Sequence, residues 1–506
     1  MKLDWKKLLF GLFVGVGMTM MPACSNDKGY DIDGTGQGEE VTGPTETGYL
    51  SMKLSLGSVG TKADPGTEVG RAQEQTVKEV WLVLYGATSN KVEYFWELKA
   101  YNTGGSFDGD DVSTESVATS SRFVTVGKPV EKQAYKMLVM VNPVASYAAS
   151  FAVGQPISNL EDAYLLDTPN LLSAANGWAE ENHFFMSNSQ GLVDVAATDV
   201  KKSAKDAERS PKSVLVDRGV AKVVMSSTIP TVPAGDNIVA LEWGLDVTNR
   251  YSYWTRHLDK LAGGSTESIG DGSSRYERYA KDPNFSGFSE AITNNPSSPV
   301  GQFYYWPERP TGLSYGFGNY GYVLENTMDA NEQYQDVTTR VVIRVNYAPA
   351  GLSNLTSFYT YAGHVITVNE MPGYAKYPET IPAELAAAGL KEAIAAVKLK
   401  YSDAFTSSTF MTSYSIAGLN FYYMGDCYYT VLLRHFDDDQ ISTPMGYGRY
   451  GVVRNNVYKL TIKSLSGPGS PIIEKPGPKP NDGETSIAAD IQVLPWQIRS
   501  QEVEDL

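Results

Sequence analysis

The sequence has 506 residues, of which 58 are acidic and 42 basic, and its formal net charge is −16. Such an excess of negative charge disfavours binding to nucleic acid or to an anionic membrane surface, because both repel an acidic protein. Only two cysteines are present, Cys24 and Cys427, so a framework of disulfides is excluded and stability must come from a large hydrophobic core.

The first 23 residues are predicted to be a lipoprotein signal peptide. Lysines at positions 2, 6 and 7 precede an apolar run over residues 8–21, which is shorter than the roughly 20 residues that a membrane-spanning helix needs. The run ends in Ala23-Cys24, a small residue followed by cysteine, as in a lipobox. We therefore expect Cys24 to be lipidated and to anchor the chain in the cell outer membrane. The alternative is an ordinary secreted protein with a chance cysteine.

Residues 24–48 are polar and are predicted to be a flexible tether. A strand follows, because apolar and polar residues alternate over residues 50–56. Leu50, Met52, Leu54 and Leu56 are expected on one face, and Ser51, Lys53 and Ser55 on the other. A polar stretch with Gly, Asp and Pro then leads to Arg71-Ala72.

The body of the chain is predicted to be mostly β. Runs rich in Val, Ile, Leu and Tyr have the length of strands and are separated by Gly, Pro, Asn and Ser, as in β-sandwiches; they lie at 77–85, 135–141, 221–226 and 338–347. One helix is expected over 381–401, where Leu390, Ile394, Val397 and Tyr401 share a face. A weaker helical stretch is expected over 160–166.

Two domains are expected in this body, over 72–230 and 231–465, with the break where a strand meets two prolines and a glycine. A terminal region, 466–506, begins with a Pro/Gly-rich linker over 466–483, which is expected to form neither ladder nor helix. Apolar residues of a strand-competent tail follow, namely Ile487, Ile491, Val493, Leu494, Trp496 and Ile498.

No pattern for catalysis, a metal or a cofactor is found, so no enzyme is predicted. The four histidines lack metal-ligand spacing, and Cys427 lies in a strand-like run that predicts a small buried residue rather than a nucleophile. Gly316, Gly318 and Gly321 match a dinucleotide-binding spacing outside the required strand–turn–helix context, so a loop is expected. The aspartates of 108–111 and 437–439 do not follow a calcium-loop spacing and are expected in solvated turns.

The aromatic residues raise an alternative function, because tyrosine and tryptophan stack on sugar rings. Two groups are candidates for a glycan site: Tyr304, Tyr305 and Trp306, and Trp243, Tyr251, Tyr253 and Trp254. Core and edge packing is the other interpretation in a chain with 32 tyrosines.

Several segments give the chain a resemblance to a known family. Residues 216–224 (VDRGVAKVV), 322–327 (YVLENT), 452–465 (VVRNNVYKLTIKSL) and 493–506 (VLPWQIRSQEVEDL), together with the lipobox, resemble the shaft fimbrillins of Bacteroidales type V pili, of the minor-fimbria type. The resemblance implies two transthyretin-like β-sandwich domains with a few short helices. It also implies a structural subunit of a cell-surface fimbrium that supports adhesion and biofilm formation.

The resemblance further implies how subunits join. A surface protease specific for Arg or Lys would cut within residues 49–71 and free the first strand, and the tail of another subunit would fill the groove. The displaced strand would carry Leu50, Met52, Leu54 and Leu56. The donor face would be Ile491 and Val493, or Leu494, Trp496 and Ile498. Donor-strand exchange of this kind makes a head-to-tail homopolymer.

Two questions stay open at this point. Family alignment favours a cut at Lys62-Ala63, whereas an arginine-specific protease would favour Arg71-Ala72. The shaft role competes with that of an accessory tip or anchor subunit of the same fimbrium, and with that of a surface glycan-binding lipoprotein. The other expected partners are tip and anchor subunits and host or bacterial receptors.

Overall fold

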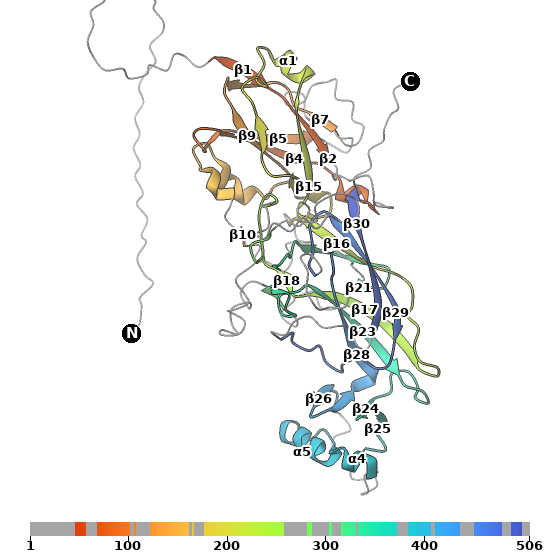
Figure 1. Cartoon of the computed structure of the whole chain (residues 1–506). Coiled ribbons are helices and arrows are strands. Elements are labelled where there is room, and N and C mark those ends of the chain that lie inside the picture. The colour runs from red at the N-terminus through yellow and green to blue at the C-terminus, as the bar shows by residue number, and fades with distance from the viewer. Residues whose placement is uncertain are drawn as a thin grey trace, which may run out of the picture. The chain divides into compact units, whose positions relative to one another are not determined.

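The computed structural model describes residues 46–56, 68–101, 106–107, 122–160, 164–165, 177–257, 281–285, 303–305, 315–329, 332–371, 383–405, 410–435, 450–477 and 487–497. By its internal contacts the chain divides into residues 1–45 and residues 46–506, and all described residues belong to the second unit. This unit is mostly β, built of packed sheets with a few short helices, which confirms the predicted fold class (Figure 1). No helix in the described ranges is long and apolar enough to cross a membrane.

The first large sheet is formed by residues that precede Gly219. Its strands run in the order β6-β5-β4-β9-β13-β15-β2-β7, and β14 pairs with β9. Their bounds are β2 (Met52–Leu56), β4 (Glu79–Gly86), β5 (Val92–Tyr101), β6 (Ser106–Phe107), β7 (Arg122–Val124), β9 (Tyr135–Val141), β13 (Met186–Asn188), β14 (Val193–Val195) and β15 (Lys212–Arg218). A separate pair, β1 (Thr47–Leu50) with β8 (Lys128–Glu131), shares the hydrophobic core with this sheet.

The core of this part is built on β4 and β9, whose sequences predicted them well. Both are nearly continuous apolar runs, and almost all their residues are buried. A run of this kind is typical of a central strand with both faces covered. Trp81, Trp178 and Trp254 fill the space around them.

The chain changes sheets at Gly219, between β15 and β16 (Val220–Met225). A Cβ atom on Gly219 would lie 2.7 Å from ring atoms of Phe185 and Trp178, so a larger residue does not fit there. The domain limits drawn at residues 230 and 231 from the sequence stay predictions.

The second body packs two sheets on each other. One has the order β22-β16-β29-β30-β3 and the other β21-β17-β23-β28. The bounds are β3 (Glu68–Val69), β17 (Asn237–Asp246), β21 (Tyr315–Gly316), β22 (Tyr320–Leu324), β23 (Arg340–Ala348), β28 (Asp426–Leu432), β29 (Asn456–Leu465) and β30 (Ile487–Gln497). Strand β28 alternates between buried and half-buried residues, and its Cys427 is fully buried, as predicted.

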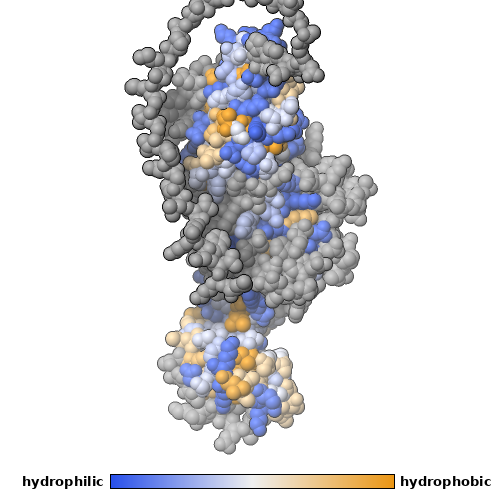
Figure 2. All heavy atoms as spheres, turned by 90° about the vertical axis from the view of Figure 1, so that its left-hand side faces the viewer, coloured by the Kyte–Doolittle hydropathy of each residue, from blue (hydrophilic) through white to orange (hydrophobic). Residues whose placement is uncertain are grey.

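A smaller sheet with two helices has a core of its own. It has the strand order β25-β24-β27-β26. The bounds are β24 (Phe358–Tyr361), β25 (His364–Thr367), β26 (Tyr414–Ile416), β27 (Leu419–Tyr422), α4 (Ala383–Ala387) and α5 (Leu390–Lys400). Figure 2 shows apolar residues scattered among hydrophilic ones over the part of this module that faces the viewer, at the lower end of the view, which is usual for a protein surface.

The helix predicted over 381–401 is two helices. Gly389 has a φ of +92°, a left-handed conformation that ends α4 and starts α5, and Tyr361 donates a hydrogen bond of 2.6 Å to the Ala388 carbonyl at this break. The predicted apolar face holds, since Leu390, Ile394 and Val397 are buried. The weaker helix over 160–166 was wrong, because a short strand, β10 (Tyr164–Leu165), lies there.

The remaining elements are short. They are β11 (Ala179–Glu180), β12 (His183–Phe184), β18 (Thr248–Asn249), β19 (Tyr251–Ser252), β20 (Phe303–Tyr304), α1 (Ala204–Arg209), and the 3-10 helices η1 (Ala72–Glu74), η2 (Ala145–Phe151), η3 (Ile157–Leu160) and η6 (Tyr423–Gly425).

Candidate functional site

The first strand occupies a slot inside the first sheet. Strand β2 lies between β15, with which it pairs in parallel, and β7, with which it pairs antiparallel. Leu50, Met52 and Leu54 are 3%, 1% and 0% exposed and belong to the first hydrophobic core. The side chain of Leu56 lies outside the part of the chain that the structure describes.

The prediction of one unbroken strand with an outward-facing Ser51 was wrong. The strand is interrupted at Ser51, so that β1 pairs with β8 while β2 pairs with β15. Ser51 is buried, and its hydroxyl donates a hydrogen bond of 2.6 Å to the Thr125 carbonyl. The Thr125 hydroxyl in turn accepts one of 2.9 Å from the Met52 amide. A buried hydroxyl needs such a partner, and Thr125 supplies it where the strand is interrupted.

These contacts define what lies beneath the first strand. Val214 and Val216 on β15 and Val130 on β8 are buried in the same core. Removal of β1 and β2 would leave these side chains uncovered and the backbone edges of β15 and β8 unpaired. Proteins avoid such an open edge unless another strand fills it.

The C-terminal tail is a strand of the second body. Strand β30 pairs antiparallel with β29 along its length, and its end at Trp496 and Gln497 pairs in parallel with β3. Ile487, Ala489, Ile491 and Val493 pack on the second core, but only Ile487 among them is classed as buried.

The tail residues singled out from the sequence therefore differ in their surroundings. Ile491 and Val493 lie on the inward face and are half-buried, and Leu494 is 6% exposed. The backbone of Trp496 is in β30, but its side chain and the whole of Ile498 lie outside the described residues.

The linker before the tail is attached to the body by an isolated β-bridge, while its described residues, 466–477, form no strand and no helix, as expected. Ser470 and Tyr428 exchange two backbone hydrogen bonds of 2.7 and 2.9 Å at the edge of β28. The hydroxyls of Tyr429 and Tyr422 donate to the carbonyls of Gly467 and Gly469, at 2.6 and 2.8 Å. A Cβ atom on Gly469 would lie 2.2 Å from the Tyr428 carbonyl oxygen, so the close approach requires glycine.

Of the two candidate cleavage bonds and the candidate lipidation site, the structure describes only the bond at Arg71-Ala72. Cys24, Lys62 and Ala63 lie outside the described residues. Arg71 is described and is one-third exposed, and Ala72 is the first residue of the 3-10 helix η1.

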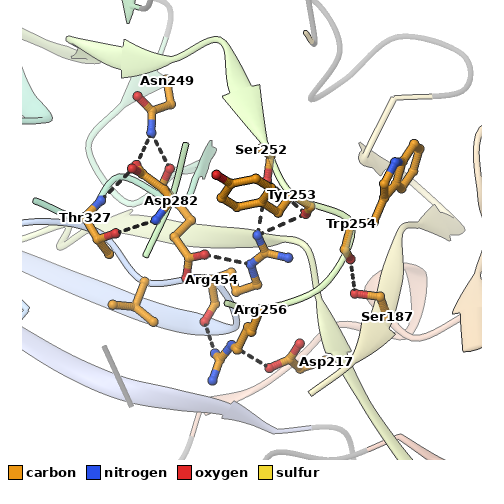
Figure 3. Close-up of polar contacts among 12 residues, drawn as sticks. Ser187, Asp217, Asn249, Ser252, Tyr253, Trp254, Arg256, Asp282, Thr327 and Arg454 are labelled. Carbon is orange, nitrogen blue, oxygen red and sulfur yellow. Dashed lines mark hydrogen bonds and ion pairs between the residues drawn. The ribbon is translucent and has the colours of Figure 1, made fainter. Parts of the chain in front are cut away.

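A buried polar network joins the loops around β15, β22 and β29 (Figure 3). Arg454 Nε donates to Glu325 Oε2 at 3.0 Å, and both residues are 1% exposed. Arg454 Nη2 also donates to the Ser252 hydroxyl and to the Tyr253 carbonyl, each at 3.2 Å. Such a pair is costly to break, because either partner alone would be a buried unpaired charge.

The network extends to Arg256, which bridges two chain segments. Its Nε lies 3.1 Å from Asp217 Oδ2, and its Nη2 donates to the Arg454 carbonyl at 2.8 Å (Figure 3). Burial raises the pKa of Asp217 to about 6, although Arg256 and Arg454 act in the opposite direction.

Asp282 forms the other end of the network. It accepts hydrogen bonds from the Asn249 side chain and, at 3.0 Å, from the Thr327 amide (Figure 3). The Asn284 amide donates another at 2.8 Å. Burial, with Glu325 nearby, raises its pKa to about 8 in spite of these donors.

The network contains three of the four segments that gave the sequence its family resemblance. Asp217, Glu325, Thr327 and Arg454 come from 216–224, 322–327 and 452–465. The acidic, amide and arginine residues of these segments therefore serve to join the segments in a buried polar network. Sequence analysis missed this, because the partners lie from 33 to 202 residues apart in the chain and leave no local signal.

The other candidate groups do not assemble a site in the described part of the chain. Trp243 and Trp254 are fully buried and Tyr305 nearly so, which contradicts their proposed stacking on a glycan; Trp306 lies outside the described residues. No cluster of metal-ligating side chains is found among the described residues. His435 is buried against the Tyr458 hydroxyl at 2.8 Å.

The remaining sequence patterns are accounted for as well. Gly316 ends β21, Gly318 lies in the short turn that follows, and Gly321 lies in β22, which belongs to the other sheet. No helix follows these glycines within the described residues 315–329, and the expected loop is present at Gly318 alone. The aspartates of 108–111 and 437–439 lie outside the described residues.

Residues 420–502 match the family model of the C-terminal region of fimbrillin, the major fimbrial subunit protein type IV. No curated protein sequence matches the chain.

Solved structures of similar proteins include a fimbrilin of Porphyromonas gingivalis, at 15% identity over 90% of this chain and 99% of that one, with a TM-score of 0.42. A putative cell adhesion protein of Parabacteroides distasonis has 12% identity over 89% and 97% of the two chains and a TM-score of 0.43. The tip fimbrial protein Mfa3 of P. gingivalis, C-terminally truncated, has 12% identity over 89% and 100%, with a TM-score of 0.36.

Proposed function

We propose that this chain, whose residues 420–502 match the fimbrillin C-terminal family model, is a structural shaft subunit of a cell-surface fimbrium. It is exported as a lipoprotein through Cys24 and activated by proteolytic removal of the first strand. It then polymerises head-to-tail when the tail of one copy enters the groove of the next. The assembled fimbrium supports adhesion.

The observation that carries this proposal is the difference between the two strands. The first strand is fully buried through Leu50, Met52 and Leu54, whereas Ile491 and Val493 of the tail are only half-buried in their own subunit. Burying a large apolar side chain contributes about 1.5–3 kcal/mol. A tail moved into a vacated groove would therefore gain burial, while an occupied groove would not release its strand spontaneously.

The arrangement also favours an open polymer over a closed dimer. The groove lies in the first sheet and the tail in the second body, so donor and acceptor surfaces are different. Contacts between unlike surfaces repeat without closing and generate filaments. A strand-competent tail also supports a shaft subunit rather than an anchor, which need not donate one.

Deletion of residues 491–506 tests the donor role. The truncated chain should fold and be cut like the full chain, and it should remain monomeric by electron microscopy and size-exclusion chromatography. Added to cleaved full-length chain, it should accept a tail and provide none, so that filaments become shorter as its share rises.

A peptide of residues 487–506 gives a second test, and the same peptide with two substitutions is its matched control. In excess it should bind the cleaved chain and stop filament growth, while the same peptide with Ile491→Asp and Val493→Asp should not. Long filaments from the truncated chain alone would show that the tail is not the donor.

A further inference from the structure

Arg71 is held at both its side chain and its backbone. Its Nε donates to Glu74 Oε1 at 3.0 Å, and its Nη2 donates to the Tyr322 hydroxyl at 3.0 Å and to Glu181 Oε1 at 3.1 Å. Its guanidinium carbon lies 4.3 Å from the centre of the Tyr320 ring, a cation–π distance.

The backbone on both sides of Arg71 is also hydrogen-bonded. Ala72 to Glu74 form the 3-10 helix η1, and the Glu74 amide donates to the Arg71 carbonyl at 3.0 Å. The Arg71 amide donates to Glu74 Oε2 at 2.7 Å. Both ends of this residue are therefore closed into one short turn.

Glu74 fixes this turn to the second body. It is 0% exposed and accepts hydrogen bonds from Lys222 Nζ on β16 at 2.9 Å and from the Tyr322 hydroxyl on β22 at 2.6 Å. Burial alone would raise the pKa of this carboxyl, but the hydrogen bonds from Lys222 and Tyr322 outweigh burial and hold its pKa below the usual value. We call Arg71, Glu74, Lys222 and Tyr322 the Glu74 clamp.

A protease acts on a different geometry. The substrate chain is extended, the side chain before the cut enters a specificity pocket, and the carbonyl oxygen of the cut bond accepts hydrogen bonds from the oxyanion hole. At Arg71 the side chain has four partners, the carbonyl accepts from Glu74, and the next three residues are helical. Cleavage would require the clamp to open and the buried Glu74 to leave its site.

We propose that the Arg71-Ala72 bond is closed to the activating protease in the folded chain, and that Arg71 is instead a permanent anchor of the mature subunit. The Glu74 clamp ties the beginning of the mature chain to β16 and β22. If the activation step of the proposed function holds, Lys62-Ala63 is the remaining candidate bond of the two.

Limited proteolysis of the full chain tests the closed bond directly. The folded chain is incubated with an arginine-specific endoprotease, and products that begin at Ala72 are followed by mass spectrometry. A synthetic peptide of residues 66–77 reports the intrinsic rate. We expect the bond in the folded chain to be cut at least about 100-fold more slowly than in the peptide, because cutting waits for local opening.

Two variants test whether the clamp is the cause. Glu74→Gln removes the charge that Arg71 and Lys222 share, and Tyr322→Phe removes only the shared hydroxyl. Each should speed cleavage after Arg71, by at least about tenfold for Glu74→Gln. Glu181→Gln, at the exposed partner, is the matched control and should change the rate little. Thermal unfolding verifies that each variant is folded. If Glu74→Gln does not fold, the cleavage rate of Tyr322→Phe alone decides the test.

The proposal is overturned if the folded wild-type chain is cut after Arg71 as fast as the peptide. It is also overturned if both folded clamp variants stay as resistant as wild type, because the protection would then have another source. These readouts do not depend on filament formation, so failure of the cleaved chain to polymerise would refute the proposed function and leave this test unaffected.

Discussion

Leu54 should contribute to stability before cleavage of the chain but not after it. It is 0% exposed in the core of the uncut chain, yet it lies on the strand that activation is proposed to remove. Leu54→Ala should therefore lower the stability of the uncut chain by about 2–5 kcal/mol, measured by chemical unfolding. The cleaved and assembled form should show no such loss.

Val214 provides the comparison for that prediction. It pairs in register with Leu54 but belongs to β15, which stays in the subunit. Val214→Ala should destabilise both forms. An equal loss from Leu54→Ala in the assembled form would show that the strand is still in place.

Asp282 should make stability depend on pH. Its pKa is raised from the ordinary value to about 8 by burial, with Glu325 nearby adding to the effect, so the folded chain holds a proton that the unfolded chain releases. The stabilisation is complete below the pKa of the unfolded chain. Above that pKa the free energy of unfolding falls by roughly 1.4 kcal/mol per pH unit, and the stabilisation is lost once the pH has risen through about 8.

Asp282→Asn should remove this part of the pH dependence. The unfolding temperature is measured between pH 5 and 9 for the variant and for wild type, and the variant should have the flatter profile. Asp194→Asn, at an exposed carboxylate, serves as the control. Superimposable profiles for Asp282→Asn and wild type would contradict the assignment.

At the scale of elements, the tail must leave β29 before it can enter another subunit. Lys459 and Gln492 are paired in register on β29 and β30. Lys459→Cys with Gln492→Cys should form a disulfide that keeps β30 paired with β29 of its own subunit, because paired strands bring Cβ atoms close enough for a disulfide. The oxidised, cleaved chain should not polymerise, and a reducing agent should restore filaments under electron microscopy.

A disulfide away from the tail controls for oxidation itself. Thr360 and Val365 are paired between β24 and β25 in the smaller module. Thr360→Cys with Val365→Cys should leave polymerisation unchanged. If the locked tail variant polymerises as readily as this control, β30 does not need to move.

At the scale of the whole molecule, cleavage should separate a stable precursor from a polymerising form. Lys62→Ala with Arg71→Ala should trap a soluble chain that does not assemble, because the groove stays occupied. If the Arg71-Ala72 bond is closed, Lys62→Ala alone should have the same effect and Arg71→Ala alone should leave maturation intact. Assembly of the uncut double variant at the wild-type rate would show that the first strand does not block the groove.

Much of this molecule followed from short-range patterns in the sequence. The alternation over residues 50–56 identified apolar residues that are buried where described, and the runs over 77–85 and 135–141 predicted the strands β4 and β9. Side-chain period and turn chemistry are local properties, so they can be recognised without knowing what a strand packs against.

The tertiary structure decided which of these elements meet. The buried Ser51 between β1 and β2 is paired with Thr125, the turn at Arg71 depends on Lys222 and Tyr322, and the tail is paired with β29 and β3. The motifs around Asp217, Glu325 and Arg454 could be noticed in the sequence, but their common site could not. Partners separated by tens to hundreds of residues are selected by the packing of whole sheets, and no local pattern reports that selection.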